Sequence, residues 1–162
     1  MMNDAMERTM NEQATEWSHL PNAAHIDWII QDVELNLIDW DAAWGDAARF
    51  AARDAAWDAA RGAAHRAACG AVWDAGREAA RETVWDAARD AAWFAARDAI
   101  QALVAYDHAG ALFDIPVEQV RVQAYLGQPA AILMLPAVNI KRNYYGDGNL
   151  AAGIFPRTKL KC

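Results

Sequence analysis

A four-residue repeat occupies the middle of the chain and restricts what it can fold into. Residues 49–100 divide into about thirteen tetrads of the form X-acid-Ala-Ala, in which X is mostly Trp or Arg and the acid is Asp or Glu. Alanine, arginine and glutamate are strong helix formers. Acids also stand three residues before arginines, as in Asp58–Arg61 and Asp86–Arg89, an order that favours ion pairs on a helix. The repeat therefore predicts α-helix.

The period of this repeat does not match the α-helix. A helix turns once every 3.6 residues, so each tetrad position rotates by about 40° from one repeat to the next. A stripe of alanines can therefore face one partner for only about 16–20 residues. Either the segment breaks into shorter helices, or neighbouring helices wrap around it. Because glycines cluster in its middle, we expect two helices, over about 40–66 and 73–112, with a kink or turn near Gly70.

The flanking segments also carry helical patterns. Residues 22–38 have an amphipathic helical pattern, with Asn22 in a position to cap its first turn. Residues 117–126 alternate between apolar and polar, which suits a helix or a strand, and helix is favoured because no second strand lies near. Residues 129–140 form a short apolar segment, expected to kink at Pro136.

These patterns predict an all-α protein. The length of 162 residues suits one domain, and 55% of the residues are hydrophobic, with alanine the commonest. We expect a compact helical bundle or helical array of about five helices, whose alanine-rich central helices pack closely. Residues 1–17 are expected to be a flexible acidic lead, 18–142 a single helical domain containing the repeat 49–100, and 143–162 an irregular basic tail.

The charge of the chain argues against nucleic-acid binding. The net charge is −7, most of the excess acid lies in the first 48 residues, and basic residues gather only near the C-terminal end. A nucleic-acid surface needs a basic stripe, whereas acids flank every tryptophan of the repeat. The sequence therefore predicts no nucleic-acid partner.

The chain also lacks the sequence features of secreted and membrane proteins. It begins with polar and acidic residues, unlike a signal peptide. The longest apolar run, 130–138, is far shorter than the roughly 20 residues that span a bilayer. Cys69 and Cys162 are few and widely separated, which favours a reducing compartment. We expect a cytoplasmic protein with no membrane partner.

Signals for catalysis and metal binding are weak. His65 and Cys69 are four residues apart, a spacing that can hold a transition metal, but a structural site needs about four ligands and the other histidines come from unrelated places. Cys69 as a nucleophile would stand in a helix interior, where no free amide could hold an oxyanion. No phosphate-binding glycine loop or hydrolase motif is present. The sequence therefore predicts no enzyme, no cofactor and no metal.

Several stretches carry a resemblance to known proteins. The Trp-Asp-Ala-Ala and Arg-Asp-Ala-Ala tetrads combine with His-Leu-Pro-Asn-Ala-Ala-His-Ile-Asp at 19–27, Ala-Leu-Val-Ala-Tyr-Asp at 102–107 and Pro-Ala-Ala-Ile-Leu-Met-Leu-Pro at 129–136. This combination resembles alanine- and tryptophan-rich helical proteins of phages and prophages, over about residues 18–140. It is more loosely similar to alanine-rich immunity-type proteins of bacterial toxin systems. The resemblance implies an all-helical protein without assigned catalytic residues.

The tryptophans and arginines of the repeat are the candidate contact residues. Our first hypothesis is a non-catalytic protein-binding module, such as a phage- or mobile-element-encoded factor that engages a host protein in the manner of an inhibitor or immunity protein. One alternative is a protein that binds or sequesters a small, nucleotide-like ligand in a pocket lined by Arg and Trp. Another is a virion or assembly component that self-associates into a homo-oligomer. The surface expected to carry contacts consists of Trp57, Trp73, Arg81, Trp85, Arg89, Trp93 and Arg97.

Overall fold

The computed structural model describes residues 15–51, 54–68, 70–82 and 90–145. The described residues contain no strand, which confirms the predicted all-α class, and their helices are more numerous than the expected five or so. They form seven α-helices and one 3-10 helix: α2 (Ala23–Leu35), α3 (Leu37–Ala51), α4 (Asp54–Ala67), α5 (Ala71–Glu82), α6 (Asp90–Ala105), η1 (Ala109–Asp114), α7 (Val117–Tyr125) and α8 (Pro129–Tyr145).

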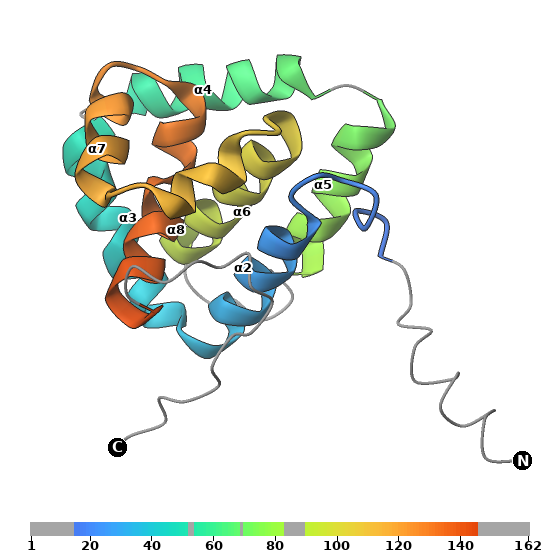
Figure 1. Ribbon diagram of the computed structural model, residues 1–162, viewed down its shortest axis with the longest axis horizontal. Helices are drawn as coiled ribbons and strands as arrows, with labels where there is room; N and C mark the ends of the chain where they lie inside the picture. Colours follow the sequence, from blue (N-terminus) through green and yellow to red (C-terminus); the bar gives the residue numbers. More distant parts are fainter. Residues whose placement is uncertain (1–14, 52–53, 69, 83–89, 146–162) are drawn as a thin grey trace, which may run out of the picture.

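Helix α8 forms the centre of the packing. It contacts α3, α4, α6 and α7, and Figure 1 shows it lying among them. Residues 130–141 are all buried, as expected for the apolar run 130–138, and the buried Lys141 donates a 2.8 Å hydrogen bond from Nζ to the carbonyl of Phe113. The helix continues through Pro136 to Tyr145, so residues 143–145, which we predicted to be in the tail, belong to a helix. The rest of the predicted tail, 146–162, lies outside the described residues.

Residues 37–105, which contain the repeat, include four helices, α3 to α6, where we predicted two over 40–66 and 73–112. Helix α3 has 15 residues, α4 has 14, α5 has 12 and α6 has 16. Each is therefore no longer than the stretch over which one alanine stripe can face a single partner, which is about 16–20 residues. Figure 1 shows that successive helices run in different directions. The predicted turn near Gly70 is confirmed, whereas α6 ends at Ala105 and does not continue to residue 112 as predicted.

The turn at Gly70 depends on a backbone conformation that favours glycine. Its φ is +57°, and a Cβ built there would meet nothing within 4 Å. We predict that Gly70→Ala lowers the free energy of unfolding by about 1–2 kcal/mol, through backbone strain alone. Gly45→Ala is the matched control, because Gly45 also has open space but lies within α3 without a positive φ. Urea denaturation should show the control variant unchanged or stabilised; equal losses in both would contradict the prediction.

The segment before α2 is tied into the fold. Trp17 is buried, and its Nε1 donates a 2.7 Å hydrogen bond to Oδ1 of Asp27. Our expectation of a flexible lead over 1–17 is therefore wrong at Trp17, while residues 1–14 lie outside the described part. Asn22 precedes α2 but makes no side-chain cap there. Instead its Nδ2 donates to the carbonyls of Leu103 (2.8 Å) and Tyr106 (3.1 Å) at the end of α6, groups that a helix end leaves without partners.

His25 packs beside this junction and gives the fold a dependence on pH. Its ring stacks on Phe113 with 5.3 Å between centroids. Burial lowers the pKa of His25 below its ordinary 6.5, although the charge of Asp114 opposes this shift. Because protonation is then easier in the unfolded chain, we expect stability to be constant above about pH 6.5 and to fall as the pH drops below it. Urea midpoints at pH 8, 6.5 and 5 measure this, and His25→Gln should flatten the curve more than His65→Gln, whose histidine is exposed.

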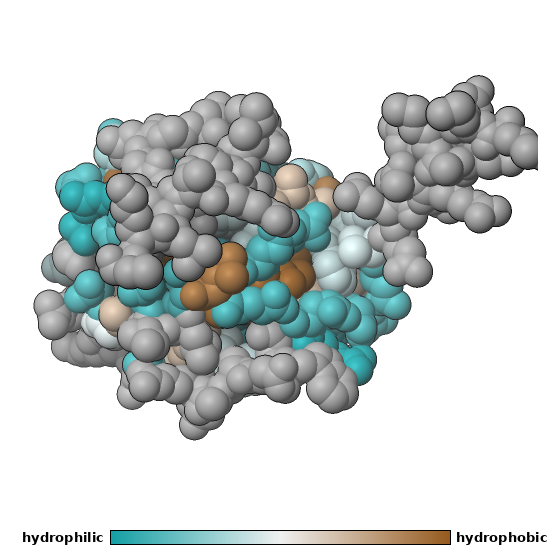
Figure 2. Space-filling model, turned by 90° about the horizontal axis from the view of Figure 1, so that it is seen from below, coloured by the Kyte–Doolittle hydropathy of each residue, from teal (hydrophilic) through white to brown (hydrophobic). Residues whose placement is uncertain are grey.

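The remaining surface is mostly polar. Residues 117–126, for which helix and strand were both considered, contain the helix α7. The described exposed large hydrophobic residues are Leu35, Val122, Tyr125 and Leu126. Figure 2 shows one face on which hydrophilic side chains surround a small hydrophobic area. Helices of the described ranges are all too short or too polar to cross a membrane.

Candidate functional site

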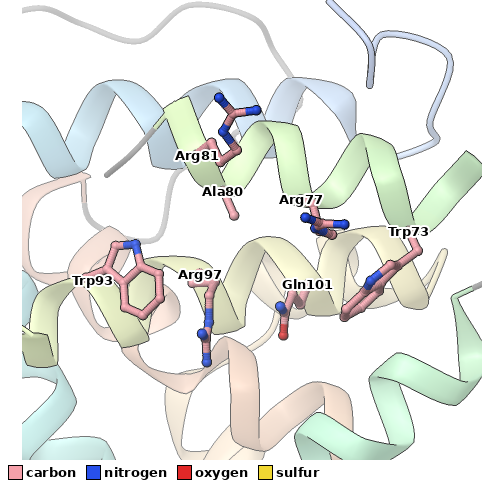
Figure 3. A pocket seen from close by; sticks show the side chains of 7 residues that line it. All are labelled: Trp73, Arg77, Ala80, Arg81, Trp93, Arg97 and Gln101. Atoms are coloured by element: carbon pink, nitrogen blue, oxygen red, sulfur yellow. The ribbon is translucent and has the colours of Figure 1, made fainter. Parts of the chain in front are cut away.

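An open groove of about 680 Å³ lies between α5 and α6. The two helices run antiparallel, so their residue numbers increase in opposite directions along it (Figure 3). Figure 3 places Trp93 at one end of the groove and Trp73 at the other, with the guanidinium groups between them. The lining residues are Trp73, Arg77, Ala80 and Arg81 from α5, and Trp93, Arg97 and Gln101 from α6.

The repeat explains why these side chains meet. Six of the seven lining residues are spaced by four along each helix, at 73, 77 and 81 and at 93, 97 and 101. These six residues continue the spacing of position X of the tetrads, which we call the first column. Three successive residues of this column rotate by only about 80° around the helix axis, so they stay on one side of the helix. Most alanines of the other tetrad positions on α5 and α6 are buried, and a Cβ at Gly76 on α5 would lie only 2.9 Å from Val104 on α6. Small residues thus bring the backbones close and leave the first columns facing each other.

The structure brings together four of the seven predicted contact residues, namely Trp73, Arg81, Trp93 and Arg97. Trp57 is only 4% exposed, and its ring lies 4.5 Å from that of Trp44, so it belongs to the core rather than to a contact surface. Trp57 faces inward because α4 packs against α6 and α8, and the first column of the tetrads points toward the core at this place along the rotating repeat. Trp85 and Arg89 lie outside the described residues.

Arg77, Ala80 and Gln101 complete the lining and were not among the predicted residues. The signal for two of them was present in the sequence. Arg77 occupies the first tetrad column, and Gln101 follows Arg97 at the same spacing of four. Sequence reasoning missed Ala80 because nothing distinguishes it from the other alanines of the repeat.

One buried carboxylate organises the charges at the α6 side of the groove. Asp98 is fully buried, and both of its oxygens accept hydrogen bonds from Nε of Arg61 on α4, each at 3.0 Å. Nη2 of Arg61 donates a third bond, of 2.8 Å, to Oδ2. Burial raises the pKa of Asp98, while the hydrogen bonds and charge of Arg61 oppose the rise. The charge of Asp98 is therefore taken up mainly by Arg61.

Arg97 makes only a long contact with the carboxylate of Asp98. Its Nη2 lies 3.7 Å from Oδ1 of Asp98, too far for a good hydrogen bond. Its guanidinium carbon lies 4.5 Å from the centre of the Trp93 ring. Burial lowers the pKa of Arg97, a shift that Asp98 opposes and the positive charge of Arg61 reinforces. Nε of Arg97 and Nε1 of Trp93 are buried donors without an acceptor among the described residues. Arg97 therefore shares Asp98 with Arg61 and contacts that carboxylate at the longer distance.

The two arginines of α5 are accessible. Arg77 lies 4.0 Å from Asp74, and the side chains of both are mostly exposed. Arg81 makes a closer ion pair with Glu78, at 2.9 Å, with 61% of the arginine side chain exposed. Exposed pairs of this kind contribute only about 0–1 kcal/mol, so a ligand can compete for either guanidinium. No carboxylate is among the described residues that line the groove, so the acidic partners of its three arginines lie behind or beside it and leave the guanidinium groups on the groove side.

His65 and Cys69, the pair considered for a metal, are not brought together with further ligands in the part of the chain that is described. The His65 ring packs edge-on against Trp73 at 4.5 Å, and Cys69 is outside the described residues. Within the described ranges no group of three or more His, Cys, Asp or Glu side chains is arranged to hold a metal.

Comparisons with known proteins give no match. No family model, no curated protein and no solved structure matches the chain. The groove between α5 and α6 is accordingly the feature on which a functional proposal can rest.

Proposed function

We propose that this chain is a non-catalytic helical binding module that engages a partner protein through the groove between α5 and α6. The observation that carries the proposal is the pair of facing columns, which put two indoles and three guanidinium groups along one open groove. Trp and Arg are the residue types that most often dominate the binding energy of protein interfaces. None of the lining side chains is a nucleophile or an ordinary general base, which supports binding rather than catalysis.

The wider role follows from the resemblance to phage and prophage proteins. We propose a factor encoded by a phage or mobile element that works in the cytoplasm of a host cell and blocks or protects one host protein. A rigid scaffold suits this role because side chains fixed before binding lose little entropy when the complex forms. Nucleic acid is not the proposed partner, because the chain carries a net charge of −7 and three arginines in one groove do not form the basic stripe that a phosphate backbone needs.

Site-specific crosslinking tests this proposal. A photoreactive benzoylphenylalanine at Gln101 places the probe in the groove, and the same residue at Gln119, exposed on α7, is the control. In lysate of the natural host we expect a discrete crosslinked protein from the Gln101 position alone. Its formation should be lost when Arg97→Glu is added, because a carboxylate would then replace the incompletely paired guanidinium. Crosslinks that are equal at both positions, or absent at Gln101, would refute the proposal.

A nucleotide-like small ligand is the second candidate, favoured by the stacked pair of Arg97 and Trp93. The groove volume of about 680 Å³ lies in the range of ligand pockets, about 300–1,000 Å³. An aromatic base could stack on an indole while the arginines hold a phosphate. Under this alternative, millimolar AMP or ATP raises the melting temperature of the chain but not that of Arg97→Gln. No change with either nucleotide would remove the alternative.

A further inference from the structure

We infer that the groove binds an acidic segment of the partner, an extended run of about four residues with two adjacent carboxylates between two apolar side chains. This inference rests on the proposed function, because it specifies what the groove recognises on the partner protein. It follows from three properties of the described groove: its charge, its length and the order of its side chains.

The charge of the groove calls for anions from outside. Arg77, Arg81 and Arg97 line it together with the amide of Gln101. Arg61 makes the short hydrogen bonds to Asp98, so Arg97 has only a 3.7 Å contact with that carboxylate on the α6 side. Arg81 pairs with Glu78 at 2.9 Å, but most of the arginine side chain is exposed. On the α5 side Arg77 has only a 4.0 Å contact with Asp74. Guanidinium groups bind carboxylates through paired N–H donors, and such charge-assisted bonds are about twice as strong as neutral ones.

The length of the groove fits a short extended peptide. Trp73 and Arg81 are eight residues apart on α5, and so are Trp93 and Gln101 on α6. Eight helical residues rise by about 12 Å. An extended chain advances about 3.3 Å per residue, so about four residues span the same distance. A segment of this length would run from one indole to the other.

The order of side chains sets the order of the segment. Figure 3 shows the indoles at the two ends and guanidinium groups from both helices between them. Successive side chains of an extended chain point in opposite directions. Two adjacent carboxylates in the middle would therefore reach Arg77 or Arg81 on one side and Arg97 on the other, while apolar residues at either end cover the indoles. A single phosphate could not reach both sides as well as two separate carboxylates.

Peptide titration with NMR detection tests the inference on the whole chain. The probes are acetylated and amidated Gly-Ser-Leu-Glu-Glu-Leu-Gly-Ser and its counterpart with Gln-Gln in place of Glu-Glu. We expect the acidic peptide to shift the indole N–H signals of Trp73 and Trp93, but not that of Trp57, which lies in the core. Each signal is assigned from the corresponding Trp→Phe variant. The glutamine peptide should bind at least about tenfold more weakly, since charge-assisted bonds become neutral ones.

Variants of the chain make the test specific. Arg97→Gln and Arg77→Gln should each weaken the acidic peptide by about tenfold, whereas Arg121→Gln on α7 should leave its affinity unchanged. The side chain of Arg77 is 66% exposed, so this variant keeps its fold even if Arg97→Gln does not.

Three results would overturn the inference. Equal binding of the two peptides would show that charge is not recognised, and inorganic phosphate acting on the same two indoles at lower concentration would assign the site to phosphate. If neither peptide binds while the crosslink from Gln101 persists, the acidic segment is wrong and the binding module stands. If neither peptide binds and the crosslink from Gln101 is also absent, the proposed function is refuted as well.

Discussion

Asp98→Ala is expected to lower the free energy of unfolding by about 3–5 kcal/mol, because it leaves two guanidinium groups in a largely buried cluster without their carboxylate. Asp98 is fully buried and accepts three hydrogen bonds from Arg61. Its Oδ1 also lies 3.7 Å from Nη2 of Arg97. Urea denaturation measures the loss directly, and circular dichroism at zero urea shows whether the variant is folded.

The matched control for this prediction is Asp58→Ala. Asp58 contacts the same arginine, with 3.3 Å to Nη1 of Arg61, but its side chain is 74% exposed. Its removal should cost no more than about 1 kcal/mol, since water replaces an exposed partner. Combining Asp98→Leu with Arg61→Met should recover part of the loss, because an apolar pair leaves fewer unpaired charges. Similar losses for Asp58→Ala and Asp98→Ala would contradict this account of the cluster.

Trp40→Ala is expected to be the second large effect, about 3–5 kcal/mol, as is typical when a large buried aromatic is removed. Trp40 is fully buried and packs on Trp28, with 6.5 Å between ring centroids. Its Nε1 donates a 2.9 Å hydrogen bond to Oδ2 of Asp32, a carboxylate that is itself buried. The substitution therefore opens a cavity and removes a donor from a buried charge.

Trp73→Ala provides the comparison for Trp40→Ala. Trp73 lines the groove and is partly exposed, so its loss should cost about 1 kcal/mol, in the middle of the range for single substitutions. Thermal and urea unfolding of both variants separate the core tryptophan from the groove tryptophan. Equal destabilisation would mean that Trp73 serves the fold rather than the groove.

The sequence predicted those features that depend on local periodicity. The tetrads predicted helices, the glycine cluster predicted the turn at Gly70, and the first column contained Trp73, Arg81, Trp93 and Arg97. The end of α6 at Ala105 was missed, because a helix was expected to run on to residue 112, although the drift of a four-residue period limits every straight helix that packs through one stripe.

Features that depend on distant contacts could not be predicted in this way. Asp98 occupies the same tetrad position as the exposed Asp58 and Asp74, and only the approach of Arg61, 37 residues away, distinguishes it. Asn22 was expected to cap its own helix, yet its amide binds a carbonyl 81 residues away. In a repeat, identical residues carry identical local signals, and tertiary packing decides which of them is buried.

The facing columns of α5 and α6 also bear on how the length of such a chain can vary. Inserting a whole tetrad into either helix would turn everything beyond it by about 40°, whereas inserting one residue would turn it by about 100°. A gain or loss of four residues therefore leaves the Arg and Trp side chains pointing roughly along the groove and changes its length by one turn. Variation in steps of four would give such proteins a series of grooves that differ in length by one helical turn, each lined by the same few residue types.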